Sequence, residues 1–181
     1  INEFYQKTGI IHRIDKDTSG VLVIAKNPIS YSFIKNQFKQ RQVNKEYLAL
    51  SLGKTKHEKI QIDAPLKRNP KHPLKFAVVQ QGKTAVTNIE KVKEYVIEND
   101  TYTLFRVFPK TGRTHQIRVH LSAINHPIAA DSIYLSKINY QKTFNLFGRL
   151  MLHARALSFV HPTTKNTVSF AAPLPKEFNL N

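Results

Sequence analysis

The sequence contains no cysteine and no tryptophan, and it has one methionine among 181 residues. Without cysteine, the chain forms neither disulfide bonds nor thiolate metal sites. It has no apolar run close to the roughly 18 residues of a membrane span, and its first residues lack the order of a signal peptide. These absences predict a cytoplasmic protein that works without a membrane.

Acidic residues are also scarce, with 12 Asp and Glu against 28 Lys and Arg. The formal net charge is +16, and this excess creates a positive field that attracts polyanions. Nucleic acid is the expected partner, because no segment pairs a basic face with the broad apolar face that binds membranes. The 41% of hydrophobic residues suffices for a core, and the length favours one domain over two.

Apolar patterning predicts short strands and a few helices. A continuous apolar run predicts a buried strand at 21–25, and Pro28 opens a helix that extends to about residue 40. Alternation over 46–52 predicts a strand with Tyr47 on the face opposite its leucines. The segment 67–73, KRNPKHP, is typical of an exposed basic loop. Further strands are predicted at 59–63, 85–96, 101–108, 156–160 and 167–171, and a helix at 114–125. This mixture indicates an α+β fold with an antiparallel or mixed sheet.

Two dense polar motifs are candidates for chemistry. HRIDKDTSG at 12–20 places Asp15 between two cations, and TGRTHQIRVHL at 111–121 supplies Arg113 and Arg118. An aspartate beside an arginine stays ionised at neutral pH, because the opposite charge offsets the loss of water. Such a carboxylate can act as a nucleophile or a base. The same residues also fit an ion pair that ties two elements together, and spacing alone favours that interpretation.

Metal sites are not expected. Asp15 and Asp17 resemble the paired carboxylates of a metal-dependent nuclease, but the other aspartates are scattered along the sequence. His115 and His120 are five residues apart, about 140° around a helix, whereas helical zinc pairs are four apart on one face.

Five stretches of the sequence occur in a familiar order: HRIDKDTSGVLVIAK, KEYLAL, GKTAVT, TGRTHQIRVHLSAINHPIAAD, and LHARALSFVHP followed by FAAPLPKEF. Together they resemble the large-ribosomal-subunit branch of the pseudouridine synthases, the RluA family, from about Gly9 to Phe178. The resemblance implies that uridine in RNA is converted to pseudouridine with no cofactor and no metal. In that reaction the glycosidic bond breaks, the uracil rotates, and its carbon 5 joins the sugar. The resemblance also implies a curved, mixed, mostly antiparallel sheet flanked by a few helices, and we expect a monomer.

The resemblance places three catalytic residues in this sequence. The aspartate of the family's HRxD motif falls on Asp15, the tyrosine of KxYLA on Tyr47, and the arginine of HQxRVH on Arg118. Asp15 then attacks the sugar, assists elimination to a glycal, or attacks the base, and the sequence does not decide among these routes. We expect Arg118 to pair with Asp15 and keep it ionised and aimed. Tyr47 is expected to stack on the uracil and to accept a proton.

The RNA is expected to be ribosomal or transfer RNA, with its target base taken out of the stack. Basic and turn residues near the motifs are the expected RNA contacts, although each also fits ordinary solvated surface. These residues are Arg13, Lys16, Thr18, Lys67, Arg68, Arg113 and His115.

The sequence departs from the family pattern in two places. Family members carry a strand and a KPxG segment upstream of HRxD, often after an S4-type RNA-binding domain. Residues 1–181 are therefore expected to be an N-terminally incomplete catalytic domain without an S4-type domain. The family's GDxxYG motif is Ala130-Asp-Ser-Ile-Tyr134-Leu here, so its turn is expected to differ. The alternatives are a non-catalytic module that binds ribosomal RNA or assists assembly on the same scaffold and, more distantly, a metal-dependent nuclease.

Overall fold

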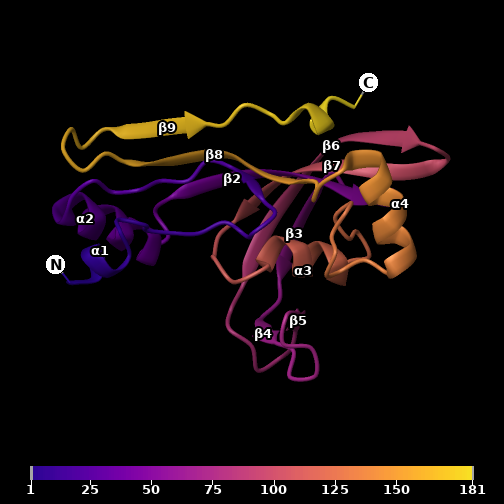
Figure 1. Cartoon of the computed structure of the whole chain (residues 1–181), viewed down its shortest axis with the longest axis horizontal. Coiled ribbons are helices and arrows are strands. Elements are labelled where there is room, and N and C mark those ends of the chain that lie inside the picture. The colour runs from indigo at the N-terminus through magenta and orange to yellow at the C-terminus, as the bar shows by residue number, and fades with distance from the viewer. Residues whose placement is uncertain (1, 181) are drawn as a thin grey trace.

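The computed structural model describes residues 2–180, and its centre is a seven-stranded sheet (Figure 1). In spatial order the strands are β1 (Ser19–Gly20), β8 (Leu152–Val160), β2 (Asn44–Leu52), β7 (Asp100–Pro109), β6 (Val86–Ile97) and β3 (Lys59–Asp63), and β9 (Thr167–Ala171) also pairs with β8. Every pair is antiparallel except β1 with β8, which is parallel. The predicted α+β class with a mixed, mostly antiparallel sheet is therefore confirmed.

Helices flank this sheet (Figure 1). They are α1 (Asn2–Gln6), α2 (Pro28–Lys39), α3 (Gln116–Ala123), α4 (Lys137–Phe147) and the 3-10 turn η1 (Lys176–Phe178). The predicted helix at Pro28 is confirmed as α2, where the Asn27 side chain accepts a hydrogen bond from the Ser30 N–H and proline occupies the first turn. No helix within residues 2–180 combines the length and the apolar character that crossing a bilayer requires.

The main core holds α3 against the sheet. Leu50 of β2 and Phe105 and Val107 of β7 are buried together with Ile117 and Leu121 of α3. Two buried anchors on one short helix fix its rotation about its own axis. The residue between them, Arg118, therefore has a defined direction.

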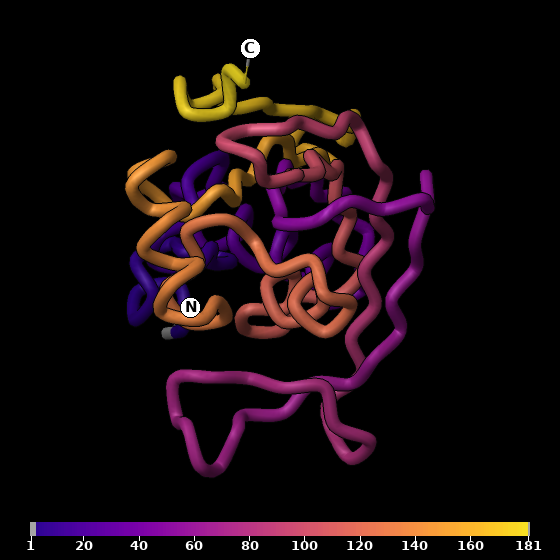
Figure 2. The backbone as a smooth tube through the Cα atoms, turned by 90° about the vertical axis from the view of Figure 1, so that its right-hand side faces the viewer, coloured from indigo at the N-terminus to yellow at the C-terminus, as the bar shows by residue number. Residues whose placement is uncertain are grey.

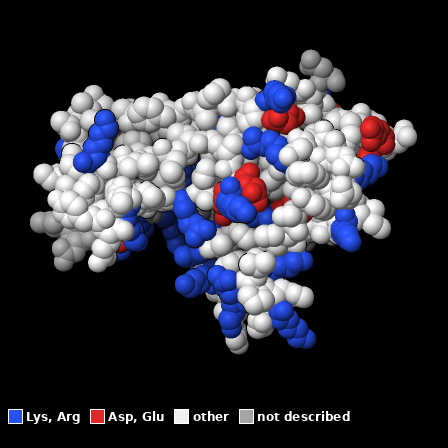
Figure 3. All heavy atoms as spheres, viewed as in Figure 1, with Lys and Arg blue, Asp and Glu red and all other residues white. Residues whose placement is uncertain are grey.

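An arm of two short strands projects from the body (Figures 1 and 2). It consists of β4 (Leu66–Arg68) and β5 (Phe76–Val78), which pair with each other in a separate sheet. The prediction of a loop over 67–73 is wrong at its start, because Lys67 and Arg68 belong to β4. Lys and Arg gather on this arm and on the part of the body directly above it (Figure 3).

The predicted strand at 21–25 is wrong. Its backbone donors go to three separate places: Val21 N–H donates to the carbonyl of Ala154, Val23 N–H to Nε2 of His12, and Ala25 N–H to the carbonyl of Gly9. Ile24 makes a single isolated bridge with Ile10, so no ladder forms over this segment.

The helix predicted at 114–125 begins only at Gln116. His115 precedes it in a left-handed conformation with φ of 55°, which a continuing helix cannot adopt.

Candidate active site

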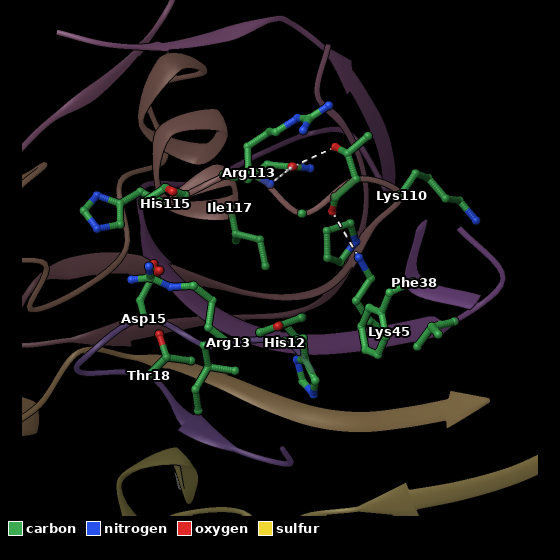
Figure 4. A pocket seen from close by; sticks show the side chains of 18 of the residues that line it. His12, Arg13, Asp15, Thr18, Phe38, Lys45, Lys110, Arg113, His115 and Ile117 are labelled. Atoms are coloured by element: carbon green, nitrogen blue, oxygen red, sulfur yellow. Dashed lines mark hydrogen bonds between the residues drawn. The ribbon is translucent and has the colours of Figure 1, made fainter. Parts of the chain in front are cut away.

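A pocket of about 530 Å³ opens beside the two polar motifs (Figure 4). Its walls are the loop before β1, helix α2, strand β2 and the segment from Pro109 to Ile117. Among the described residues, Asp15 is the only carboxylate that lines it. Seven cationic residues line it: Arg13, Lys35, Lys39, Arg41, Lys45, Lys110 and Arg113. The cations suit the pocket to bind a polyanion, and Asp15 is the carboxylate that can act on it.

A tight turn and strand β1 position Asp15. The Thr18 N–H donates to the carbonyl of Asp15 at 3.1 Å, and the chain then enters β1. Gly20 lies against β8 with φ of 121°, and a Cβ there would come within 2.1 Å of the Ala154 carbonyl oxygen. Only glycine fits this close approach, which explains the last residue of HRIDKDTSG.

Side chains from β8 and the residues before it fasten the same turn. Arg149 Nη2 donates to Ser19 Oγ at 2.5 Å, and Ser19 Oγ lies 2.8 Å from Nδ1 of His153. Because Ser19 accepts from the arginine, its own hydroxyl is free to donate to the imidazole. The loop that carries Asp15 is therefore tied to the sheet.

Arg118 lies between two carboxylates. Its Nη1 is 3.5 Å from Asp15 Oδ2, whereas Nε and Nη2 each donate to Asp131 at 2.7 Å. The structure thus brings Arg118 to Asp15 as expected, but Asp131 is its closer partner. Burial by itself would lower the pKa of Arg118, yet Asp131 and to a smaller extent Asp15 raise it overall. The guanidinium is a fixed positive charge at the edge of the pocket.

The sequence motifs did not point to Asp131 as a partner of Arg118. This residue is fully buried, and its Oδ1 also accepts from the backbone N–H groups of Ile133 and Tyr134. Ala130 stands where the family has glycine and adopts φ of 55°, with its N–H donating to Thr143 Oγ1. The left-handed turn therefore forms without glycine, and the ADSIYL stretch was the signal for Asp131.

Tyr134 and His115 extend this network. The Phe76 N–H donates to the Tyr134 oxygen at 2.9 Å, which leaves the Tyr134 hydroxyl to donate to Nδ1 of His115 at 3.0 Å. Burial, and then the charge of Arg118, lower the pKa of His115. The Tyr134 ring also lies 5.3 Å from the guanidinium carbon of Arg118.

Tyr47 lines the pocket from β2 and is half-buried. Burial raises the pKa of its hydroxyl to about 12, and the negative charge of Asp15 adds to the effect. The side chain therefore meets a substrate as a neutral phenol, with a ring that can stack and a hydroxyl that can donate or accept a hydrogen bond.

Gln116 fixes the loop that forms the far wall. Its Oε1 accepts from the hydroxyl of Thr111 and from the N–H of Arg113, while its Nε2 donates to the Val86 carbonyl and to Thr87 Oγ1. One buried amide thus joins the loop to β6. This explains the glutamine that precedes the arginine in the second motif.

The residues expected to contact RNA lie in three places. Arg13, Arg113, His115 and Thr18 line the pocket, and Thr18 is buried with a hydroxyl that has no hydrogen-bond partner among the described residues.

Lys16 is exposed outside the pocket lining, and Lys67 and Arg68 are exposed on the arm. Within residues 2–180, no group of three or more His, Asp or Glu side chains is arranged to hold a metal ion.

Comparisons with known proteins agree on one family. A family described as RNA pseudouridylate synthase matches residues 2–123. The uncharacterized RNA pseudouridine synthase YlyB of Bacillus subtilis is 40% identical over 171 residues, which are 94% of this chain and 54% of that protein. Ribosomal large subunit pseudouridine synthase D of Nitrosomonas europaea is 40% identical over 174 residues, 94% of this chain and 49% of the relative.

The fold comparison gives the same result. The solved structure of human RNA pseudouridylate synthase domain containing 1 superposes with a TM-score of 0.80 at 31% identity, covering 95% of this chain and 72% of that one. The chain spans about half the length of the curated relatives it matches. With both sequence and fold in agreement, the chain belongs to the RNA pseudouridylate synthase family.

Proposed function

We propose that the pocket converts uridine in RNA to pseudouridine and that Asp15, Tyr47 and Arg118 carry the reaction. The observation that carries this proposal is the position of Asp15, the single carboxylate among the described lining residues, beside a buried arginine that a second carboxylate holds in place.

The reaction needs a carboxylate in a positive surrounding. The bond between the sugar and nitrogen 1 of the uracil breaks, carbon 5 of the rotated uracil bonds to the sugar, the proton on carbon 5 leaves, and nitrogen 1 gains a proton. Asp15 acts by attack on the sugar, by assisting elimination to a glycal, or by attack on the base. Arg118 presents a positive charge to the carboxylate from a fixed position, because the bidentate bonds to Asp131 remove the freedom of the guanidinium.

Tyr47 is suited to hold the uracil once it leaves the RNA stack. An aromatic face offsets part of the lost stacking, and the neutral phenol exchanges a proton with the base or with Asp15 during the steps. Arg13 lines the pocket and is exposed, which suits a side chain that fills the vacated stack or contacts phosphate.

The proposed substrate is large-subunit ribosomal RNA, with transfer RNA as the second candidate. The printed name of the Nitrosomonas relative supports the ribosomal choice, and the net charge of +16 supports RNA in general. We propose that residues 1–181 act as one catalytic domain, in the cytoplasm and as a monomer.

The test is to incubate the purified chain with large-subunit ribosomal RNA and, separately, transfer RNA, then map pseudouridines in each. New pseudouridine at discrete sites of the ribosomal RNA, unaffected by a metal chelator, is expected. Binding without any pseudouridine would favour the non-catalytic module, and chelator-sensitive cleavage would favour the nuclease.

A further inference from the structure

Lys45 is a partly buried cation without an acidic partner in the described part of the chain. It lines the pocket from β2, two residues before Tyr47, and its Nζ donates to the carbonyl oxygen of Thr111 at 3.1 Å. The contrast is Lys91, whose side chain is 18% exposed and which pairs with both Glu58 and Glu94. Buried ammonium groups are normally paired with carboxylates, so the surroundings of Lys45 are unusual.

A second cation increases this imbalance. Burial, and to a smaller extent the charge of Lys110, together lower the pKa of Lys45 to about 8. Lys110 is exposed, lines the same pocket and has no ion pair within residues 2–180. Two ammonium groups that repel each other in a pocket favour an anion between or beside them.

The position of these lysines separates them from the reacting carboxylate. Figure 4 places Lys45 and Lys110 on one side of the pocket and Asp15 and His115 on the other. At 530 Å³, the pocket exceeds the space that one uracil ring fills, so a neighbouring group of the same ligand fits within it.

The wall around Lys45 is preorganised. His12 accepts from the Val23 N–H at Nε2 and stacks on Phe38 with a centroid distance of 4.7 Å. The Thr111 carbonyl that receives Lys45 belongs to the loop fixed by Gln116. Lys45 therefore keeps its place without a ligand and has two remaining N–H donors to offer.

We propose that Lys45 and Lys110 form a phosphate subsite that holds a phosphodiester group of the RNA strand beside the target nucleotide. This inference rests on the proposed function, because the RNA strand must enter the pocket to present its uridine to Asp15. A phosphodiester of the RNA suits this place, since its two unesterified oxygens share the charge and can accept from both ammonium groups. By holding one phosphate, the subsite determines which nucleotide of the RNA strand is placed at Asp15.

The test measures binding, so it does not depend on turnover. A 5′-fluorescein-labelled hexauridylate is titrated with the 181-residue chain by fluorescence anisotropy at several salt concentrations. Lys45→Gln keeps a donor for the Thr111 carbonyl and removes the charge, and Lys110→Gln alters an exposed side chain that places no demand on folding. Lys176→Gln is the matched control, because Lys176 is exposed and lies outside the pocket.

Each pocket variant is expected to weaken binding about tenfold and to reduce the salt slope by about 0.7, the value for one phosphate contact on a single strand. Lys176→Gln should leave both quantities near the wild-type values. With a hexauridylate whose linkages are neutral methylphosphonates, the pocket variants and wild type should bind alike. Inorganic phosphate is the second probe. At a concentration equal to that of the oligonucleotide, phosphate should not displace the oligonucleotide.

Wild-type affinity and salt slope in both Lys45→Gln and Lys110→Gln would overturn the subsite. A loss of affinity in Lys45→Gln that persists with the neutral oligonucleotide would also overturn it. Displacement of the oligonucleotide by equimolar inorganic phosphate would overturn it too, because it would indicate a site for free phosphate. Failure of the proposed function gives a different result, namely no pseudouridine from a wild-type chain that still shows the lysine-dependent binding.

Discussion

The carboxylate of Asp131 receives two hydrogen bonds of 2.7 Å from the guanidinium of Arg118, and both side chains are buried. The remaining nitrogen of that guanidinium, Nη1, lies 3.5 Å from Asp15. Asp131 thus directs, through one arginine, the charge that faces the proposed nucleophile. The pair joins a helix of the core to a turn 13 residues further along the chain.

Asp131→Asn is expected to destabilise the protein by about 3 kcal/mol, because it leaves the buried charge of Arg118 without its main partner. Urea unfolding monitored by circular dichroism measures the change. Asp63→Asn, at an exposed position of β3, is the control and should change the free energy of unfolding by less than about 0.5 kcal/mol. An Asp131→Asn protein as stable as the wild type would show that this ion pair is not needed to hold Arg118.

Tyr47→Phe separates the ring from the hydroxyl. We expect binding of RNA within roughly twofold of wild type, since the stacking face remains, and kcat about 100-fold lower, since the proton-exchanging group is lost. Because the pKa of Tyr47 is about 12, the wild-type rate should not show a transition from this phenol between pH 6 and 9. Single-turnover assays at several pH values test both points, and a wild-type kcat in Tyr47→Phe would remove the hydroxyl from the mechanism.

His12 should make stability fall on acidification. Burial, and then the charge of Lys45, lower the pKa of His12 to about 4, whereas the unfolded chain has about 6.5. The unfolded state therefore binds the proton first, so the stability is fully present above about pH 6.5 and is lost as the pH falls towards 4.

Between pH 7 and pH 5, this linkage predicts that the wild type loses about 2 kcal/mol more than His12→Gln. Glutamine still accepts from the Val23 N–H but does not titrate. Urea midpoints at the two pH values give the comparison, and parallel losses in both proteins would contradict a buried neutral His12.

The chain's affinity for RNA should fall as Lys45 loses its proton. Its pKa is about 8 in the free protein, so hexauridylate binding should weaken by up to about tenfold from pH 7 to pH 9. His12, with a pKa of about 4, and Tyr47, with a pKa of about 12, titrate outside this range. The other cations that line this pocket are Arg13, Lys35, Lys39, Arg41, Lys110 and Arg113.

Lys45→Gln provides the control for this pH dependence, because it cannot lose a charge in that interval. Its affinity should be nearly constant from pH 7 to pH 9. If the affinity of the wild type is also constant from pH 7 to pH 9, then Lys45 does not lose its proton in that interval.

The regular part of the fold follows from local patterns. The period of two over 46–52 and the proline at 28 correctly predicted β2 and α2, although β2 is buried on both faces at residues 49–51. The segment 21–25 has the composition of a strand, but its N–H groups bond to Gly9 and to the His12 ring. That competition depends on tertiary structure, so the pattern of apolar residues does not contain it.

In the candidate site, too, some residues were predictable from the sequence and others depend on tertiary structure. Family motifs led to Asp15, Tyr47 and Arg118, which the structure gathers at one pocket and its edge. The closer partner of Arg118 was missed because several aspartates are scattered along the sequence, and only the left-handed turn at Ala130 shows which of them reaches α3. Lys45 was missed because its burial without a carboxylate emerges only once β2 and the loop at Thr111 meet.

In the proposed reaction, Asp15 performs the chemistry. The most direct test compares wild type with Asp15→Asn for pseudouridine formed per enzyme on the same large-subunit ribosomal RNA, with RNA binding measured in parallel. Asparagine keeps the size of the side chain but removes its charge and nucleophilicity, so pseudouridine formation should disappear while binding stays within roughly twofold of wild type. Turnover retained in Asp15→Asn would contradict the assignment of the active site.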